Sequence, residues 1–421
     1  MTLQDVKKTA LASIWFVFLT FPIMVIRVNT ITQTVVWRWH NMLYIFLGTF
    51  FGGLLWRFAL TRRKVGAKPI VQTEDEKAAA AQSAAATTGL KGTVAQLKVR
   101  LAEPAVRKSL IAAGLVLVLL FPIFSSLYQT SIMITALIYV MLALGLNIVI
   151  GLGGMLHLGY IAFFAVGAYT YGILYRFFDV GFWVALPIAA FFSTLAGILL
   201  ALPVLRLRGD YLAIVTLGFA EIVRILLNNA TGFSGGPAGI RGIPRPTFFG
   251  IQMNLATVSI YIYYIIVVAV AVTIFVVWRF ENSRIGRALV AMGEDDIAAE
   301  AMGIDIARVK LTAFALGSFW AGIAGVIFAS RTTFINPASF TVWQSIIVLS
   351  CVVLGGMGSI KGVIIGALGL ILIPEYLRAF SDYRMLIFGA VLVIMMVFRP
   401  GGLIQKKRKA YTFAVQTEEQ G

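Results

Sequence analysis

Residues 257–279 read TVSIYIYYIIVVAVAVTIFVVWR, and Arg279 at the end is the only charged side chain among them. A helix needs about 20 apolar residues to cross about 30 Å of hydrocarbon, so this stretch predicts a membrane-spanning helix. The composition agrees, because 60% of the 421 residues are hydrophobic, only 13% are charged and the mean hydropathy is +0.91. A soluble domain holds about 25% charged residues. We therefore predict an integral membrane protein.

Runs of the same kind recur on both sides of this stretch. They predict an all-α polytopic bundle of about 10–12 transmembrane helices, some of which are short or broken. The further runs lie near residues 11–28, 42–60, 109–127, 130–150, 158–177, 182–204, 211–228, 309–330, 343–357, 362–379 and 384–398.

The formal net charge of +17 indicates how the bundle is oriented. The cations mostly flank the apolar runs, where the cytoplasmic ends of membrane helices collect Lys and Arg. We therefore expect membrane lipid around the chain and no nucleic acid. With the N-terminus in the cytoplasm, residues 61–108, 206–210, 280–308 and 406–409 fall inside, and 229–256 fall outside. Both termini are then cytoplasmic.

A low-complexity stretch at residues 71–92, rich in Ala, Thr and Gln, reads as part of a linker. It separates an N-terminal extension of two spans, residues 1–60, from a larger transmembrane core at 109–404. Residues 61–108 are then a cytoplasmic linker, and residues 405–421 a basic cytoplasmic tail.

Two glycine clusters, GLGGMLHLG at 151–159 and LGGMGSIKG at 354–362, share Gly-Gly-Met and end an apolar run. Glycine-interrupted spans at corresponding places indicate discontinuous helices from an internal repeat, whose exposed backbone lines a transport pathway. Close helix packing through small residues is the alternative. The candidate pathway residues are Gly153, Gly154, Gly355 and Gly356.

Ionisable residues within the apolar runs are few, and the clearest pair is Glu221 with Arg224. The two stand three residues apart, so they share one helix face. One interpretation is a self-neutralised pair near a helix end. The other places Glu221 in the substrate pathway, because ionisable residues inside membranes often mark transport routes.

No catalytic or energy-supplying motif is present in the sequence. Neither glycine cluster fits the phosphate-binding pattern G-x-x-x-x-G-K-[ST]. With one cysteine, Cys351, and two histidines, His40 and His157, we expect no metal site. The chain is thus not expected to be an enzyme or to bind a cofactor, and any pumping would draw on ATP and magnesium bound by another chain.

Residues 283–304, SRIGRALVAMGEDDIAAEAMGI, interrupt the apolar sequence with charge. Ile285, Leu289 and Met292 are spaced for one helical face, and Gly293 then interrupts. The acids after Gly293 suit the first turn of a second helix, whose apolar stripe is Ile297, Ala301 and Ile304. We call residues 283–304 the docking segment.

The charge of the docking segment favours a protein partner. A helix resting among lipid headgroups is the alternative, but such helices favour Lys and Arg on their polar face. The segment instead has four acids against two bases. The candidate docking residues are Arg284, Arg287, Gly293, Glu294, Asp295, Asp296, Glu300 and Gly303.

The docking segment and the helix after it, SRIGRALVAMGEDDIAAEAMGIDIARVKLTAFALGSFWAGIAGVIFA, resemble permease subunits of branched-chain amino-acid ABC importers, the LivM type. Further segments resemble the same family in order, and the likeness covers roughly residues 109–404. They are GLNIVIGLGGMLHLGYIAFFAVGAYTYGIL, PVLRLRGDYLAIVTLGFAEIVRILLNN, VVLGGMGSIKGVIIGA and LIFGAVLVIMMVFRPGGLI.

The resemblance implies a multi-pass protein of the bacterial inner membrane and a set of partners. These are a second permease subunit of the LivH type, two cytoplasmic ATPases and a periplasmic amino-acid-binding protein. The cytoplasmic E-A-A-x-x-x-G loop of ABC importers is matched only approximately by EAMGI at 300–304, with shorter spacing. Arg241 and Arg245, in the predicted outer loop, are candidate contacts for the binding protein. A non-transporting membrane scaffold and a stand-alone secondary carrier are the alternative functions.

Overall fold

The computed structural model describes residues 26–29, 34–37, 116, 118–205, 207, 209–247, 254–376, 389, 393, 395, 397, 399 and 401–404. The chain divides into two units, residues 1–109 and 110–421. In the first unit, β1 (Ile26–Asn29) pairs antiparallel with β2 (Thr34–Trp37). Strand β1 takes up the last residues of a run that was predicted to be helical. The rest of the predicted hairpin and linker lies outside the described residues.

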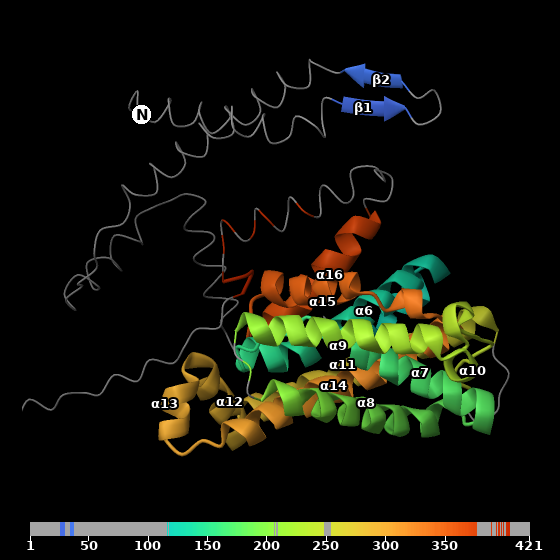
Figure 1. Cartoon of the computed structure of the whole chain (residues 1–421). Helices are drawn as coiled ribbons and strands as arrows, with labels where there is room; N and C mark the ends of the chain where they lie inside the picture. Colours follow the sequence, from blue (N-terminus) through green and yellow to red (C-terminus); the bar gives the residue numbers. More distant parts are fainter. Residues whose placement is uncertain are drawn as a thin grey trace, which may run out of the picture. The chain divides into compact units, whose positions relative to one another are not determined.

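The second unit is a helical bundle (Figure 1). Each apolar run predicted between residues 130 and 379 corresponds to one of its long helices, which confirms the all-α class. The long helices are α6 (Leu127–Asn147), α7 (Ile161–Phe178), α8 (Phe182–Val204), α9 (Asp210–Asn229), α11 (Leu255–Glu281), α14 (Ile306–Thr332), α15 (Val342–Gly355) and α16 (Ile360–Tyr376).

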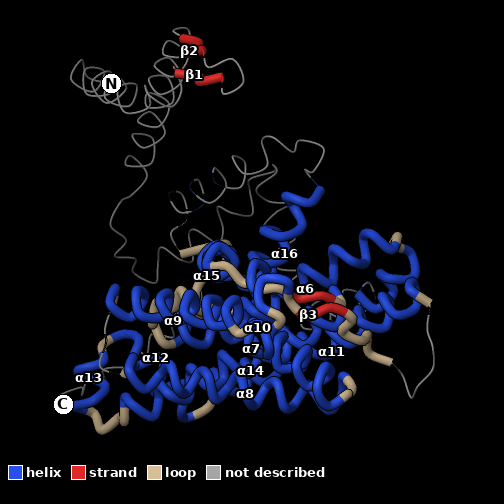
Figure 2. Tube along the Cα trace, turned by 45° about the vertical axis from the view of Figure 1, so that its right-hand side comes forward, coloured by secondary structure: helices blue, strands red, loops and turns tan. Residues whose placement is uncertain are grey.

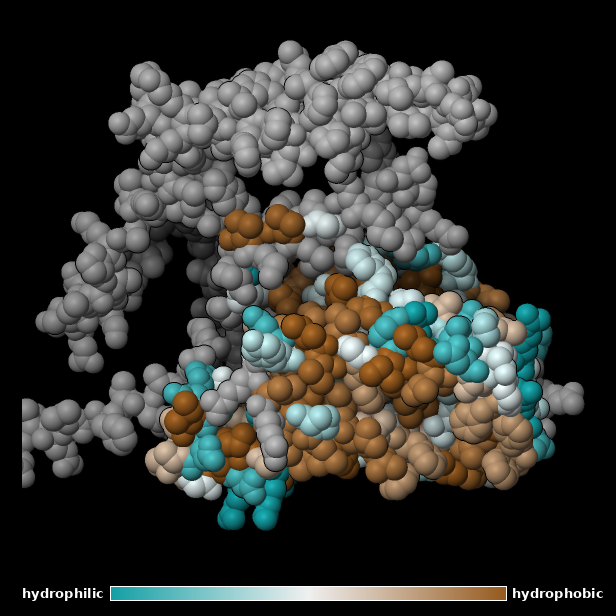
Figure 3. All heavy atoms as spheres, in the orientation of Figure 1, coloured by the Kyte–Doolittle hydropathy of each residue, from teal (hydrophilic) through white to brown (hydrophobic). Residues whose placement is uncertain are grey.

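Six helical stretches among the described residues are long and apolar enough to cross a membrane. In the space-filling view, a broad apolar band covers the visible middle of the bundle, and polar residues gather towards its two ends (Figure 3). This arrangement is typical of a multi-pass membrane protein. The six stretches are Leu127–Leu152, Ile161–Phe178, Phe182–Val204, Leu255–Glu281, Ile306–Thr332 and Pro337–Gly355.

The connections alternate between two ends of the bundle. At one end lie α12 (Arg284–Glu294) and α13 (Asp296–Ala301), which form most of the docking segment. At the other end lies α10 (Thr231–Ser234) (Figures 1 and 2). There β3 (Ile240–Arg241) pairs antiparallel with β4 (Phe334–Ile335), which joins two connections of the chain. The segments predicted inside and outside thus lie at opposite ends.

Helix α14 packs closely against α7 and α8 through small residues. A Cβ atom added at Gly322 would lie 2.6 Å from the Ser193 Cβ, and one at Gly197 would lie 2.7 Å from the Ser318 Cβ. The Ser193 hydroxyl donates to the Ser318 carbonyl at 2.8 Å. Small side chains let helix backbones approach within the membrane, where lipid offers no hydrophobic drive for helix association. The three helices therefore form one rigid core.

Both glycine clusters lie where one helix ends and the next begins. Helix α6 continues as a π-helical turn, η1 (Ile148–Leu152), and helical structure resumes only at α7. Helix α15 ends at Gly355, and Gly356 and Gly358 have φ angles of 114° and 77° that favour glycine. Each cluster thus lies in the connection between two successive helices, and a helix broken within one span stays a prediction. The internal repeat stays a prediction.

Candidate functional site

The docking segment folds as two short helices, joined two residues later than predicted. Helix α12 continues through Gly293 to Glu294, and α13 begins at Asp296. The junction lies at Asp295, whose carboxylate accepts from the N–H groups of Ile297 and Ala298, each at 3.0 Å. Asp is a good N-cap because it satisfies N–H groups that the helix leaves unpaired. The prediction of a break at Gly293 was therefore wrong.

The buried face of the docking segment differs in part from the predicted stripe. Leu289 and Met292 are 0% and 5% exposed, as their spacing predicted, but Ile285 is 46% exposed. In α13 the buried residue is Ala299, whereas Ile297 is 64% exposed. The second predicted stripe was therefore wrong at Ile297 and Ala301, whereas Ile304 packs against the core; α13 presents apolar surface outward.

Gly293 and the first glycine cluster pack against each other. A Cβ atom at Gly293 would lie 2.9 Å from the Leu152 carbonyl oxygen and 3.0 Å from the Gly153 carbonyl carbon. Gly154 has a φ of 65°, and a Cβ atom there would lie 3.1 Å from the Gly293 carbonyl oxygen. Any side chain at this junction would push α12 away from η1. Close packing is thus observed at Gly153 and Gly154, and their role in a pathway stays a prediction.

Most predicted docking residues are accessible. Asp296 is partly buried, while the others are exposed; among them Arg287 donates to the Asn282 carbonyl at 3.0 Å. The outward surface also carries two large apolar side chains, Ile297 and Met302, and Met302 is 83% exposed. Apolar anchors ringed by charge are typical of protein-binding surfaces. The exposed predicted residues are Arg284, Arg287, Gly293, Glu294, Asp295, Glu300 and Gly303.

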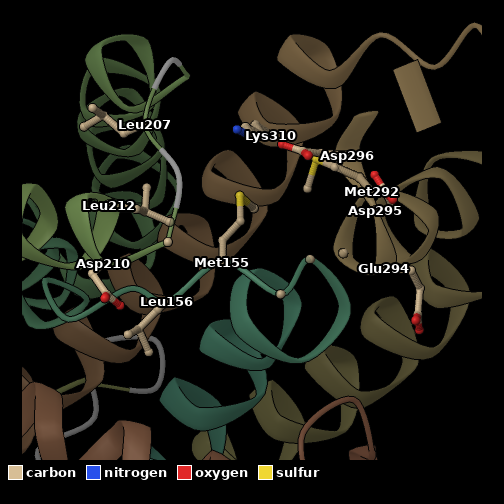
Figure 4. Close-up of a pocket in the computed structure, with 14 residues that line it drawn as sticks. Met155, Leu156, Leu207, Asp210, Leu212, Met292, Glu294, Asp295, Asp296 and Lys310 are labelled. Atoms are coloured by element: carbon tan, nitrogen blue, oxygen red, sulfur yellow. The ribbon is translucent and has the colours of Figure 1, made fainter. Parts of the chain in front are cut away.

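A cavity of about 390 Å³ lies beside the contact between Gly293 and the first glycine cluster, and we call it the Gly293 cavity (Figure 4). In Figure 4, Met155 lies between Leu212 of α9 and Met292 of α12. The cavity therefore brings the docking segment, the first glycine cluster and the start of α9 to one place. Its lining is Gly153, Gly154, Met155, Leu156, Leu207, Gly209, Asp210, Leu212, Met292, Gly293, Glu294, Asp295, Asp296 and Lys310.

Lys310 was not predicted as a functional residue, although it lines the Gly293 cavity. Its side chain is only 6% exposed, and its ammonium group donates to the Leu205 carbonyl at 3.2 Å. Leu205 is the C-cap of α8, where a cation interacts favourably with the helix dipole. A lone lysine within an apolar run, at the start of α14, was the sequence signal for this contact.

The second glycine cluster contacts the end of α6 through Asn147, which also was not predicted. The Gly358 N–H donates to the Asn147 side-chain oxygen at 2.9 Å. A Cβ atom at Gly355 would lie 2.4 Å from the Gly362 carbonyl oxygen, and one at Gly356 would lie 2.5 Å from the Ile404 carbonyl oxygen. Gly355 and Gly356 are thus also closely packed, and their pathway role stays a prediction.

Glu221 and Arg224 form an ion pair in the second half of α9, so the self-neutralised pair of the first interpretation is observed. The Arg224 Nε donates to both carboxylate oxygens of Glu221 at 3.0 Å, and Nη2 also contacts one of them. Their side chains are 37% and 33% exposed respectively. The pair is therefore internally satisfied but open to whatever adjoins α9.

Arg241 and Arg245 lie at the opposite end from the docking segment. The Arg241 guanidinium lies 5.7 Å from the centre of the Phe334 ring, in the β3–β4 region. It also borders a hollow of about 580 Å³ with residues 175–179. Arg245 is partly buried. Contact of either residue with another protein stays a prediction.

His157, in the first glycine cluster, is fully buried in a cage formed by Tyr160, Phe163 and Phe314. Neither ring nitrogen has a hydrogen-bond partner among the described residues. Burial lowers the pKa of His157 from 6.5 to about 3, because the charged ring would lie away from water without a hydrogen-bond partner. His157 is thus neutral, and the described residues contain no cluster of His, Cys, Asp or Glu fit for a metal.

A bundle of helices long and apolar enough to cross a membrane, with an exposed charged segment between α11 and α14, defines a multi-pass membrane protein. Comparison with known proteins gives its family. Residues 128–396 match the family described as the permease component of branched-chain amino acid transport systems. The chain belongs to this family.

Three relatives illustrate the range of this family. The chain is 44% identical over 322 residues to the high-affinity branched-chain amino acid permease protein LivM of Salmonella typhimurium, covering 72% of this chain and 76% of the relative. It is 26% identical to a probable LivM of Methanocaldococcus jannaschii, over 53% of this chain and 68% of the relative. It is 27% identical to the autoinducer 2 import permease LsrC of Salmonella paratyphi B, over 50% and 59%. No solved structure matches the chain.

Proposed function

We propose that the chain is a permease subunit of an ATP-driven importer of branched-chain amino acids. The observation that carries this proposal is the exposed docking segment, in a member of a permease family whose sequence has no phosphate-binding loop. A chain without such a loop needs a separate ATPase. Identity of 44% to LivM, far above the 27% to LsrC, supports an amino acid as the substrate.

The proposed assembly has five chains in the bacterial inner membrane and on its two sides. A second permease of the LivH type pairs with this one, two ATPases that bind ATP and magnesium dock in the cytoplasm, and a periplasmic binding protein delivers the amino acid. The docking segment then faces the cytoplasm, as do both termini. Arg241 and Arg245 face the periplasm, where their charge suits acidic residues of the binding protein.

Transport in this assembly is coupled through α14. Closure of the ATPases moves the docking segment, and α14 begins at Ile306, directly after it. Packing against α7 and α8, together with the bond from Lys310 to the α8 C-cap, makes these helices follow. ATP shifts the equilibrium only if the docking segment contacts the ATPases differently in the inward-open and outward-open states.

Two measurements test the proposed function. Uptake of labelled leucine, isoleucine, valine and phenylalanine is compared between a strain lacking this chain and the same strain with the chain restored. We expect restored uptake of the branched-chain substrates, and unchanged uptake would contradict the proposal. Purification from native membrane should co-isolate a pair of ATPases. A stable chain without ATPase would favour a secondary carrier, and partners without ATPase activity would favour a scaffold; family membership favours neither.

A further inference from the structure

The outward face of α9 differs from the other outward faces of the bundle. On α8, the residues exposed along the helix include Trp183, Phe191 and Leu199, and on α11 they include Val268 and Phe275, all apolar. Such faces suit lipid. The exposed face of α9 instead combines apolar residues with the Glu221–Arg224 ion pair.

Five residues form a continuous stripe on this face, which we call the α9 stripe: Asp210, Ile214, Gly218, Glu221 and Ile225. Their spacing of three or four residues places them on one side of the helix. Ile214 and Ile225 are 65% and 46% exposed. A Cβ atom added at Gly218 would have no neighbour within 4 Å. The α9 stripe is therefore exposed at Asp210, Ile214 and Ile225 and partly exposed at Gly218 and Glu221.

Glu221 lies in the second half of α9. At about 1.5 Å per residue, it is about 16 Å along the helix from Asp210 and about 12 Å from Asn229, the two ends of α9. Ionisable residues inside membrane bundles almost always face protein or a water-filled space. The Glu221–Arg224 pair therefore favours protein or water, and not lipid, beside the α9 stripe.

The N-terminal end of the α9 stripe borders the Gly293 cavity, whose lining includes Asp210. The same cavity is lined by the docking segment at Gly293 and by the first glycine cluster at Gly153 and Gly154. A molecule that moves along the α9 stripe from Glu221 towards Asp210 therefore arrives beside the segment that we propose to be moved by the ATPases.

Resting on the proposed function, we propose that the α9 stripe lines the translocation passage and that the Glu221–Arg224 pair is a transient binding site for a zwitterionic amino acid. The ammonium group of the substrate pairs with Glu221 and its carboxylate with Arg224. Its apolar side chain lies over Ile225 or in the space beside Gly218.

The chemistry of this exchange suits a passage. The ion pair is satisfied before the substrate arrives, and a zwitterion replaces one pair of opposite charges by two. The gain is small because each new contact is offset by loss of the bidentate contact within the pair. A site in a conduction pathway has to be weak enough for release.

The chain offers a clean test, because its single cysteine, Cys351, is buried. Cysteines placed at Ile214, Gly218 and Ile225 in the assembled importer, reconstituted in vesicles, are treated with a positively charged methanethiosulfonate reagent. Cysteines at Val268 and Phe191, on the apolar faces, serve as matched controls. We expect the three stripe positions to react about tenfold faster or more than the controls, because the reagent needs water around the thiol.

Leucine is the second probe. We expect it to slow labelling of Gly218→Cys, and we expect Arg224→Gln in the same chain to raise the leucine concentration for half-protection about tenfold or more, since a hydrogen bond to a charged group contributes about 1.5–3 kcal/mol. Two results would overturn the inference: stripe positions as unreactive as the controls, or protection that is indifferent to Arg224→Gln. If leucine import continues in either case, only the inference fails; absence of import by the unaltered complex removes the proposed function itself.

Discussion

Replacement of Gly293 by Ala gives opposite expectations from the sequence and from the structure. Gly293 lies within α12, at ordinary helical φ. Ala is favoured over Gly in a helix by about 1 kcal/mol, so propensity alone predicts a more stable docking segment. The structure predicts the reverse, because the added Cβ atom would lie 2.9 Å from the Leu152 carbonyl oxygen and 3.0 Å from the Gly153 carbonyl carbon.

The magnitude follows from what has to move. Both neighbours of the added methyl group are backbone atoms, so α12 must shift away from η1 or η1 must deform. Overpacking of this kind costs about 1–3 kcal/mol, which leaves a net loss of up to about 2 kcal/mol after the gain in propensity. A loss of 1.4 kcal/mol changes the balance between the docked and displaced arrangements tenfold.

The assay is leucine import together with substrate-stimulated ATP hydrolysis by the assembled complex. We expect Gly293→Ala to lower both by severalfold. The control is Gly369→Ala in α16, where an added Cβ atom would have only the Ile373 side chain at 3.9 Å; we expect it to change neither. Equal or improved coupling in Gly293→Ala would refute the contact between α12 and η1 as part of the mechanism.

Three further predictions concern the two glycine clusters and the docking segment. Asn147→Ala leaves the Gly358 N–H without its acceptor, so the unfolding free energy should fall by about 1–3 kcal/mol; an unchanged melting temperature would contradict this. His157 has a lowered pKa of about 3, so below pH 6.5 only the unfolded chain takes up its proton, and stability falls as the pH falls. His157→Phe should remove about 2 kcal/mol of the stability loss between pH 7 and pH 5 in melting experiments. Glu294→Lys with Asp296→Lys should lower substrate-stimulated ATP hydrolysis, and full stimulation would count against the docking role.

The membrane helices were predictable because hydropathy acts over whole runs of sequence. Each run between residues 130 and 379 reappears as a helix, with ends shifted by a few residues. The alternation of the connections also followed, since each helix that crosses the membrane reverses the side on which the chain emerges. Strands β3 and β4 escaped prediction, because two-residue strands carry no period that a sequence can show.

The docking segment was predictable in kind but not in register. Charge and period indicated two short amphipathic helices, and Leu289 and Met292 are buried as expected. The junction moved to Asp295 because its side chain caps α13, whereas Gly293 keeps its helical conformation against η1. Burial of Ala299 in place of Ile297 depends on the neighbouring helices, and no local pattern contains that information.

The contacts that join distant segments were beyond prediction. Asn147 and Gly358 are 211 residues apart, and Lys310 and Leu205 are 105 residues apart. Each is a single polar residue within an apolar run, which signals a partner but does not identify it. The same holds for the Gly293 cavity, whose lining comes from α9, α12 and α14 and from the first glycine cluster.

The most direct test of the account is to identify what touches the docking segment during transport. Cysteines at Ile297 and Met302, which are 64% and 83% exposed, are treated with a short bifunctional thiol cross-linker in the importing complex, where Cys351 is buried. We predict cross-links to the ATPase subunits whose yield changes when ATP is added. Docking-segment cysteines that link to no ATPase, while ATP-driven leucine import continues, would contradict the account.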